Sequence, residues 1–290
     1  ALGGTVAGPG MFEDQITNRL NLIVNVDIGE HTFTSQTAWH KWRDPRYTEI
    51  DGTALNLFGI LENESNKSFT QEFRIGSPTG GRLQYLGGVF YYWNDWANDM
   101  TNLGSPSNTV GFPLTGTAAG RSTQKTDAIS AFASATYELV DNLKLDAGAR
   151  YTREDKEGTM SRVSSGTIGF SLPTVPVTPL LDLKARPVDF NVGLRYTPTD
   201  AWMLYATFSR GSKSGGYQDQ AAVPEAAPYA PETAFSTEVG AKVSFGAGDF
   251  VALSLFNTDI DGFQNPYTAP IGGVSRALIG NANIRSRGFE

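Results

Sequence analysis

The chain has 290 residues, a formal net charge of −7 and no cysteine, which excludes disulfides, thiolate catalysis and cysteine-ligated metals. The acidic balance also argues against a nucleic-acid partner. The mean hydropathy is −0.26, and no apolar run approaches the roughly 20 residues of a spanning helix, so a helical membrane protein is excluded. A transmembrane barrel is not excluded, because half of each barrel strand is polar.

Apolar and polar residues alternate along most of the chain, which predicts β-strands, and helical periodicity is nearly absent. We expect residues 1–16 to be an irregular lead-in and residues 17–290 to form an all-β, antiparallel domain. In chain order, about eleven strands are predicted, over residues 19–28, 31–42, 67–76, 82–93, 135–139, 143–152, 186–197, 201–212, 234–245, 250–260 and 281–290.

The connections between these strands alternate between short and long. Short turns are expected at residues 29–30, 77–81, 140–142, 198–200 and 246–249, and long polar connections at 43–66, 94–124, 155–185, 213–231 and 262–280. Ordinary domains have connections of about 4–6 residues. The alternation puts every long connection at one end of the sheet, which is typical of outer-membrane barrels with short periplasmic turns and long external loops.

The hairpin Ala135–Thr152 has one apolar and one charged face, and residues 186–197 and 234–245 repeat this pattern. We expect the apolar residues to face lipid and the charged residues to face a lumen. The residues expected at lipid are Leu139, Leu143, Leu145, Val192, Leu194, Val239 and Val243; those expected in the lumen are Glu138, Lys144, Asp146, Arg150, Asp189, Arg195, Glu238 and Lys242. We expect Glu238 to pair with Arg195 and Asp146 with Arg150, whereas the pattern at residues 250–259 leaves either facing open.

A soluble β-sandwich would show the same alternation, so the period alone does not decide between the two architectures. Aromatic residues near strand ends favour lipid, because interfacial girdles have this form. The expected girdle residues are Tyr137, Tyr151, Tyr196, Trp202 and Phe245. The apolar residues between them are mostly Ala, Val and Leu. Residues of this size suit contact with lipid, whereas a sandwich core would be expected to contain more large, interlocking side chains.

Four segments in order carry a family resemblance: FTQEFRIGSPTGGRLQYLGGVFYYW, YATFSRGSKSGGYQ, YAPETAFSTEVGAK and NANIRSRGFE. With the hairpin YELVDNLKLDAGARYT, they resemble the β-barrel of a TonB-dependent outer-membrane receptor over residues 17–290. The resemblance implies a transmembrane barrel of about 22 strands around an N-terminal plug. It also implies a location in the bacterial outer membrane and energised import of a scarce ligand such as an iron–siderophore.

The resemblance implies several partners: outer-membrane lipid and lipopolysaccharide, a small-molecule ligand, and TonB acting through the plug. No plug or TonB-box-like segment precedes the first predicted strand. We therefore expect the chain to be a piece of a longer protein, with TonB reached only through a plug outside these residues. The alternative is that these strands close into a smaller barrel of their own, because an open sheet would leave unpaired backbone groups in lipid.

Aromatic and basic residues in or beside the long connections are candidate ligand contacts, because such side chains suit an aromatic, anionic siderophore. They are Trp93, Trp96, Arg121, Arg210, Lys213 and Tyr217, although girdle or solvent positions would suit them equally well. We expect no metal or cofactor, since His31 and His40 are the only histidines and neither lies in a ligand spacing. GSKSGG at 211–216 lacks the P-loop spacing, and no catalytic constellation is evident, so we expect no enzyme.

Two other functions remain open at this stage. A passive porin-like channel would use a similar barrel and would conduct ions after reconstitution. A soluble secreted all-β binding or hydrolytic domain would stay in solution without detergent, and a hydrolase would need an acid pair that the sequence does not reveal.

Overall fold

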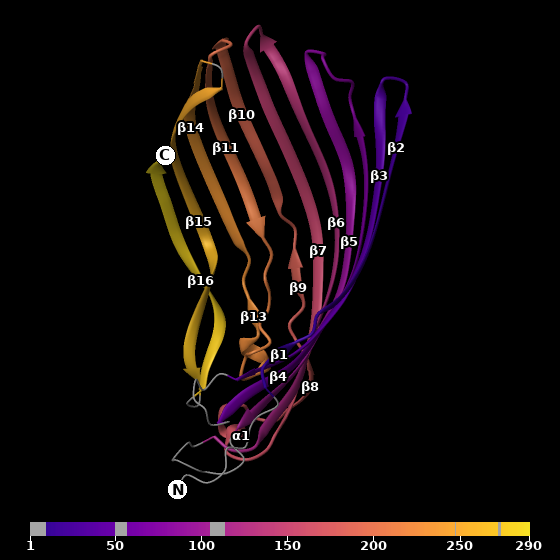
Figure 1. Cartoon of the computed structure of the whole chain (residues 1–290), viewed down its shortest axis with the longest axis vertical. Coiled ribbons are helices and arrows are strands. Elements are labelled where there is room, and N and C mark those ends of the chain that lie inside the picture. Colours follow the sequence, from indigo (N-terminus) through magenta and orange to yellow (C-terminus); the bar gives the residue numbers. More distant parts are fainter. Residues whose placement is uncertain (1–9, 50–56, 105–113, 247, 272–273) are drawn as a thin grey trace.

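The computed structural model describes residues 10–49, 57–104, 114–246, 248–271 and 274–290. These residues form a tall, strongly curved antiparallel sheet, as the all-β expectation requires (Figure 1). The long strands are β2 (Ile16–Ile28), β3 (His31–Glu49), β4 (Phe58–Gly76), β5 (Leu83–Gly104), β6 (Thr117–Val140), β7 (Leu143–Ser164), β10 (Val188–Thr199), β11 (Trp202–Lys213), β14 (Glu232–Phe245), β15 (Asp249–Ile271) and β16 (Val274–Phe289). No helix within the described ranges has the length and apolarity for a membrane crossing.

Each long strand is hydrogen-bonded to its neighbour in sequence. A short strand, β1 (Phe12–Glu13), pairs with β3 inside the expected irregular lead-in, and β2 already begins at Ile16. Two further short strands, β8 (Val175–Pro179) and β9 (Leu183–Ala185), add to β7. Among the described residues, β2 pairs only with β3 and β16 only with β15, so the sheet is open and these strands are its two edges (Figure 1).

The short turns gather at the top of Figure 1. Gly29 has φ 62° and Asn142 has φ 68°, in the left-handed region that suits glycine and tolerates asparagine. The turn after β6 contains two residues, Asp141 and Asn142, and not the three expected, because Val140 still pairs with Leu143.

The opposite end of the sheet differs from expectation. Much of the predicted loops at 43–66, 94–124 and 262–280 is strand, and β3 and β4 stay paired as far as Glu49 opposite Gly59. Polar side chains occur on both faces there, so the sequence loses its regular alternation while the backbone ladder continues. Residues 50–56, 105–113 and 272–273 of these connections lie outside the described residues.

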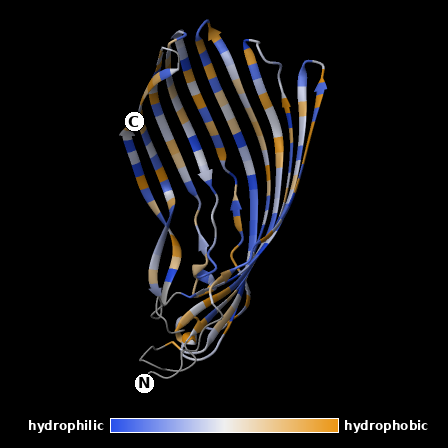
Figure 2. Ribbon diagram, in the orientation of Figure 1, coloured by the Kyte–Doolittle hydropathy of each residue, from blue (hydrophilic) through white to orange (hydrophobic). Residues whose placement is uncertain are grey.

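The cross-strand register fixes which side chains share a face, because directly opposite residues point the same way. Leu145 lies opposite Leu194, and Lys144 lies opposite Arg195. The strands therefore carry alternating apolar and polar residues in phase with one another (Figure 2). One face of the upper sheet is apolar and the other is polar.

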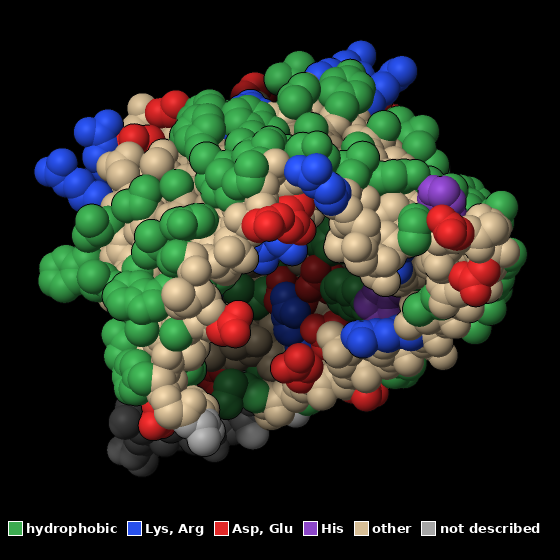
Figure 3. Space-filling view, turned by 90° about the horizontal axis from the view of Figure 1, so that it is seen from above, with side chains coloured by type: hydrophobic (Ala, Val, Ile, Leu, Met, Phe, Trp, Pro, Cys, Tyr) green, Lys and Arg blue, Asp and Glu red, His purple; other side chains and the backbone are tan. Residues whose placement is uncertain are grey.

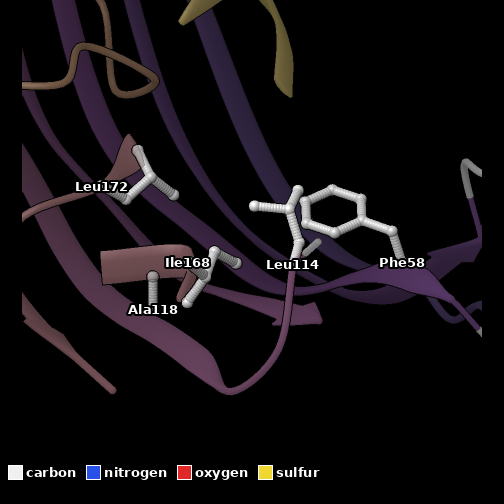
Figure 4. Packing of buried hydrophobic residues seen from close by; sticks show 5 residues of the cluster. All are labelled: Phe58, Leu114, Ala118, Ile168 and Leu172. Atoms are coloured by element: carbon white, nitrogen blue, oxygen red, sulfur yellow. The ribbon is translucent and has the colours of Figure 1, made fainter. Parts of the chain in front are cut away.

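At the lower end, a small apolar cluster packs where connections from three strands meet (Figure 4). Its members are Phe58, Leu114, Ala118, Ile168 and Leu172, each at most 6% exposed. The short helix α1 (Ile168–Ser171) supplies Ile168, which is 0% exposed. Gly116 and Gly166 allow the two connections to touch, since a Cβ on Gly166 would lie 2.4 Å from the Thr115 oxygen.

Ile168→Ala should loosen this end of the sheet. Removing a fully buried side chain leaves a cavity and typically costs about 2–5 kcal/mol. We expect faster amide hydrogen exchange in the lower ends of β6 and β7, measured on the detergent-solubilised protein, with exchange near the short turns unchanged.

The matched control is Phe170→Ala in the same helix, because Phe170 is 90% exposed. Its exchange should resemble that of the unmodified protein. Equal acceleration in both variants would show that the Ile168 cluster does not hold the lower end together.

Candidate functional site

The polar face of the sheet encloses a hollow (Figure 3). Lysine, arginine and acidic side chains lie inside the hollow, and hydrophobic side chains cover much of the outer surface. A recess of about 390 Å³ on this face is lined by Asp146, Arg195, Tyr205, Glu238 and Lys242 from four strands. We call the hollow the lumen.

The charged residues of the lumen pair differently from the sequence expectation. Arg195 bonds with Asp146 across β10 and β7 at 3.4 Å, and not with Glu238. The reason is the strand order: β11 lies between β10 and β14, and the Tyr205 hydroxyl on β11 donates to Glu238 instead. Lys242 lies 5.8 Å from the centre of the Tyr205 ring, which completes a continuous polar row.

Arg150 was expected to pair with Asp146 but binds elsewhere in the lumen. Its guanidinium lies 5.1 Å from the centre of the Phe90 ring and 5.8 Å from that of Phe132. Its Nη2 donates to the Ser130 hydroxyl at 2.9 Å. Phe132 lies directly opposite Arg150 and provides the aromatic surface, whereas Asp146 is four residues away on the same strand.

The remaining lumen candidates also contact polar neighbours. Lys144 lies 3.7 Å from Glu138. Asp189 accepts a hydrogen bond from Ser212 at 2.7 Å and lies 3.7 Å from Arg210. These groups form local pairs along the sheet and do not converge on one catalytic centre.

The facing of residues 250–259, which the sequence left open, follows from the register with β14. Leu253 lies opposite Ala241 and Leu255 opposite Val239, so both share the apolar face. Phe256 lies opposite Glu238 and therefore belongs to the lumen side.

The residues assigned to lipid and to the girdles lie on the apolar face. Val192, Leu194 and Val239 are 43–46% exposed. Leu143, Leu145 and Val243 belong to the same face by register, and Leu139 is the extra residue of a bulge next to the turn. The five aromatic residues Tyr137, Tyr151, Tyr196, Trp202 and Phe245 are 40–52% exposed. Contact of these residues with lipid stays a prediction.

The connection at 213–231, expected as an external loop, folds into the lower lumen. Its residues 214–231, here called the inner segment, contain β12 (Gly216–Tyr217), the 3-10 turn η2 (Pro224–Ala226) and β13 (Pro228–Tyr229). Arg162 on β7 donates to the Ala221 and Ala222 oxygens at 2.7 and 2.8 Å. Asp219 accepts from Asn98 on β5 at 2.8 Å.

An acidic network lies beside this contact. Arg46 bonds with Glu62 at 2.6 Å and with Asp44 at 2.9 Å, and the Glu62 bond raises the Arg46 pKa. Trp96 donates from its indole nitrogen to Glu64 at 2.6 Å. In the described ranges, no group of three His, Cys, Asp or Glu residues is placed to hold a metal ion.

The six candidate ligand contacts do not form one site. Trp93, Arg121 and Arg210 have the register of the apolar face: Arg210 lies opposite Phe190, and Arg121 forms an exposed ion pair with Asp99 at 2.6 Å. The other three candidates, Trp96, Lys213 and Tyr217, lie on the lumen side or in the inner segment.

The sequence reasoning missed Asn98, Asn102, Arg162, Asp219 and Arg276, which meet at the lower lumen. Arg276 on β16 is 2% exposed and donates to the Asn102 side-chain oxygen on β5 at 3.0 Å. Burial, followed by the charge of the neighbouring Arg162, lowers its pKa to about 10. Asn102 and Arg276 are 174 positions apart, so no spacing pattern could have paired them.

Tyr217→Phe tests the packing of the inner segment. The Tyr217 hydroxyl has two main-chain acceptors for its one proton, the Leu181 oxygen at 2.7 Å and the Lys156 oxygen at 3.1 Å. Burial, followed by Asp182, raises its pKa to about 12. The wild-type minus variant ultraviolet titration should therefore contain a phenolate transition near pH 12, not near 10.

The same shift predicts a pH dependence of stability. The folded pKa of Tyr217 exceeds its unfolded value, so its contribution is complete below about pH 10 and is lost between about 10 and 12. A transition near pH 10 in the difference titration would mean that Tyr217 is solvated and the inner segment is not packed as described.

Comparisons with known proteins agree with this architecture. The family model "TonB dependent receptor-like, beta-barrel" matches residues 4–290. The ferric yersiniabactin uptake receptor FyuA from Yersinia pestis aligns with 97% of this chain and 40% of its own, at 15% identity and a TM-score of 0.76. The ferric-catecholate import receptor Fiu from E. coli K12 aligns with 97% of this chain and 45% of its own, at 15% identity and a TM-score of 0.67.

The copper transporter OprC aligns with 97% of this chain and 44% of its own, at 12% identity and a TM-score of 0.69. Likeness at such identities shows the fold alone. The chain spans less than half the length of these three proteins. The family match, which covers nearly the whole chain, shows more: the chain belongs to the TonB-dependent receptor-like β-barrel family, whose barrels lie in the bacterial outer membrane.

Proposed function

We propose that the chain is part of the barrel of an outer-membrane receptor that imports a scarce small ligand, with an iron–siderophore as the leading candidate. The observation that carries this proposal is the family match over residues 4–290. The family's proteins are transporters, not enzymes. In this proposal, TonB supplies energy through a plug that lies outside the residues of this chain.

The lumen surface supports a plug as the partner. Its row of Asp146, Arg195, Tyr205, Glu238 and Lys242 is polar and open, with a recess of about 390 Å³. A surface of this kind suits a hydrated protein domain better than an apolar ligand. Polar groups of a protein domain can replace the water molecules that bond with these charged side chains, and an apolar ligand cannot.

The ligand class rests on the neighbours and on few residues of this chain. FyuA is a ferric yersiniabactin uptake receptor, Fiu a ferric-catecholate import receptor and OprC a copper transporter, so the same fold serves more than one metal. Of the candidate contacts, Lys213 is the last residue of β11, is exposed and has the register of the lumen side. In contrast, the Trp96 indole nitrogen and the Tyr217 hydroxyl already have protein acceptors. Lys213 is therefore the best-placed candidate for an anionic ligand.

Lipopolysaccharide is the second proposed partner, at the outer face. Lys41 and Lys67 lie directly opposite each other and are exposed. Two residues away along the same strands, and therefore on the same face, lie Trp39 and Phe69. These two residues and Trp93 are directly opposite one another and have the register of the apolar face. Like charges directly opposite repel each other, so a lipid phosphate beside this aromatic row would stabilise both lysines.

Uptake measured in cells tests the proposed function. The probe is radioactive iron bound to siderophores recovered from the host bacterium's iron-starved medium. A strain lacking the gene should accumulate less iron than the complemented strain, and complementation should fail when TonB is also absent. Uptake that persists without TonB, together with ion conductance in planar bilayers, would instead support a passive channel.

Leu145→Arg tests the outward facing that this function requires. If Leu145 lies near the bilayer midplane, an arginine there should cost about 2–4 kcal/mol, because its charge would lie in hydrocarbon. The measurement is urea unfolding of the protein in lipid vesicles, followed by the heat-sensitive gel migration of folded barrels.

Lys144→Arg is the matched control, because the neighbouring residue points into the lumen beside Glu138. That variant should unfold as the unmodified protein does. Equal destabilisation in the two variants would contradict the assigned facing, and a chain that stays soluble and monomeric without detergent would contradict the membrane location.

A further inference from the structure

A small cavity lies where strands from distant parts of the sheet meet at the lower end of the lumen. It measures about 20 Å³ and is lined by residues of β5, β6, β7 and β16 and of the inner segment. Its polar lining includes four residues that are each at most 5% exposed: Asn98, Asn102, Arg162 and Arg276. A space of this size takes about one particle of the size of water, so it is distinct from the open recess of the lumen and has no room for a siderophore.

The lining of this cavity carries more positive than negative charge. Arg162 and Arg276 both belong to it, and among the described residues Asp219 is its one carboxylate. Within the same part of the chain, Arg162 donates to two main-chain oxygens of the inner segment and Arg276 to the Asn102 side-chain oxygen, and all these acceptors are neutral. One positive charge is therefore in excess, and a single monovalent anion would balance it.

The two guanidinium groups lie close enough to affect each other. Burial, followed by the charge of Arg162, lowers the pKa of Arg276 to about 10. Burial also lowers the pKa of Arg162. Like charges in a site that water barely reaches are unfavourable unless a group of opposite charge lies beside them. Strands β7 and β16 are five steps apart in the sheet order, so no backbone ladder between them offsets this repulsion.

Arg276 has donors left for such a group. Its Nη1 donates to Asn102 at 3.0 Å, whereas Nε and Nη2 are buried and make no hydrogen bond to any described residue. Nε and Nη2 form one edge of the planar guanidinium, so their N–H groups can bind the same acceptor. This edge suits one anion.

Water is the competing occupant of the cavity. The Asn98 side-chain oxygen is also buried without a partner among the described residues, and a water molecule could donate to it. Water would, however, leave the excess charge of the lining unbalanced. Hydrogen bonds in which a partner is ionised are roughly twice as strong as neutral ones, so the two arginines outweigh the one amide oxygen. The size of the cavity restricts the anion to a monatomic one.

We propose that this cavity is a structural halide site, in which one chloride ion accepts from Nε and Nη2 of Arg276 and offsets the charge of Arg162. The ion stabilises the approach of β16 to β5 and β7, which the strand pairing alone does not provide. It is not an imported ligand, and the inference does not depend on the proposed uptake function.

Bromide tests the position of the ion directly. Crystals of the full-length receptor, grown with sodium bromide in place of sodium chloride, should show an anomalous scattering peak within hydrogen-bonding distance of Nε and Nη2 of Arg276. Density at this position without anomalous signal would identify a water molecule and overturn the halide site. Absence of any density would overturn it as well.

Chloride dependence in solution tests the structural role. Sodium chloride is compared with sodium gluconate at equal ionic strength, because gluconate is too large for the cavity. Amide hydrogen exchange in residues 98–104, 158–164 and 276–280 should slow by about tenfold at a chloride concentration about ten times the dissociation constant, since an ion bound to the closed state suppresses local opening. Exchange near the short turns should not change.

Arg276→Gln should abolish this chloride dependence. The matched control on the same strand is Arg285→Gln, because the Arg285 side chain is 63% exposed and pairs with Asp259, so its chloride dependence should equal that of the unmodified receptor. Equal chloride dependence in the two variants would overturn the site. A bromide peak without chloride dependence in solution would mean an adventitious ion only and would overturn the structural role. If Arg276→Gln does not fold, the bromide peak and the chloride dependence of the unmodified receptor decide.

Discussion

The antiparallel backbone ladder is the constraint on which the other features of this chain depend. In a bilayer, each backbone amide and carbonyl must be satisfied by another strand, and the ladder provides those bonds. Its register also decides the chemistry of both faces: Leu145 lies opposite Leu194, and Lys144 opposite Arg195. A slip of one residue would move charges to the apolar face, so the strand pairing and the polar lumen are specified together.

Sequence reasoning works well where the two faces differ and poorly where they do not. Residues such as Val188, Val192 and Tyr196 alternate with polar ones, and the strands over that region could be located from the period alone. Beyond the apolar band, residues such as Asp44 and Glu64 are polar although their strands remain paired. The period there carries no signal, which is why extended strands are mistaken for loops.

The site was harder to predict, for two separate reasons. The facing of Trp93, Arg121 and Arg210 could have been predicted from the sequence, because extending the alternation of the neighbouring strand puts each in phase with the apolar face. Sequence patterns could not have predicted the second feature, because curvature of the whole sheet brings β5, β7 and β16 together. This feature is the group of Asn98, Asn102, Arg162, Asp219 and Arg276. Such contacts depend on how far the sheet curls, and no local pattern encodes that.

The two ends of the molecule differ in what holds them. Through the apolar band, the wall is held by an unbroken ladder, and opening it would expose backbone groups to lipid. At the lower end, the inner segment is attached by side chains such as Arg162 and by a few buried apolar residues, next to polar atoms that have no hydrogen-bond partner among the described residues. Breaking these contacts exposes groups to water, which can satisfy them. Movement is therefore least costly at the end where the inner segment lies, and it does not require any change in the paired strands of the apolar band.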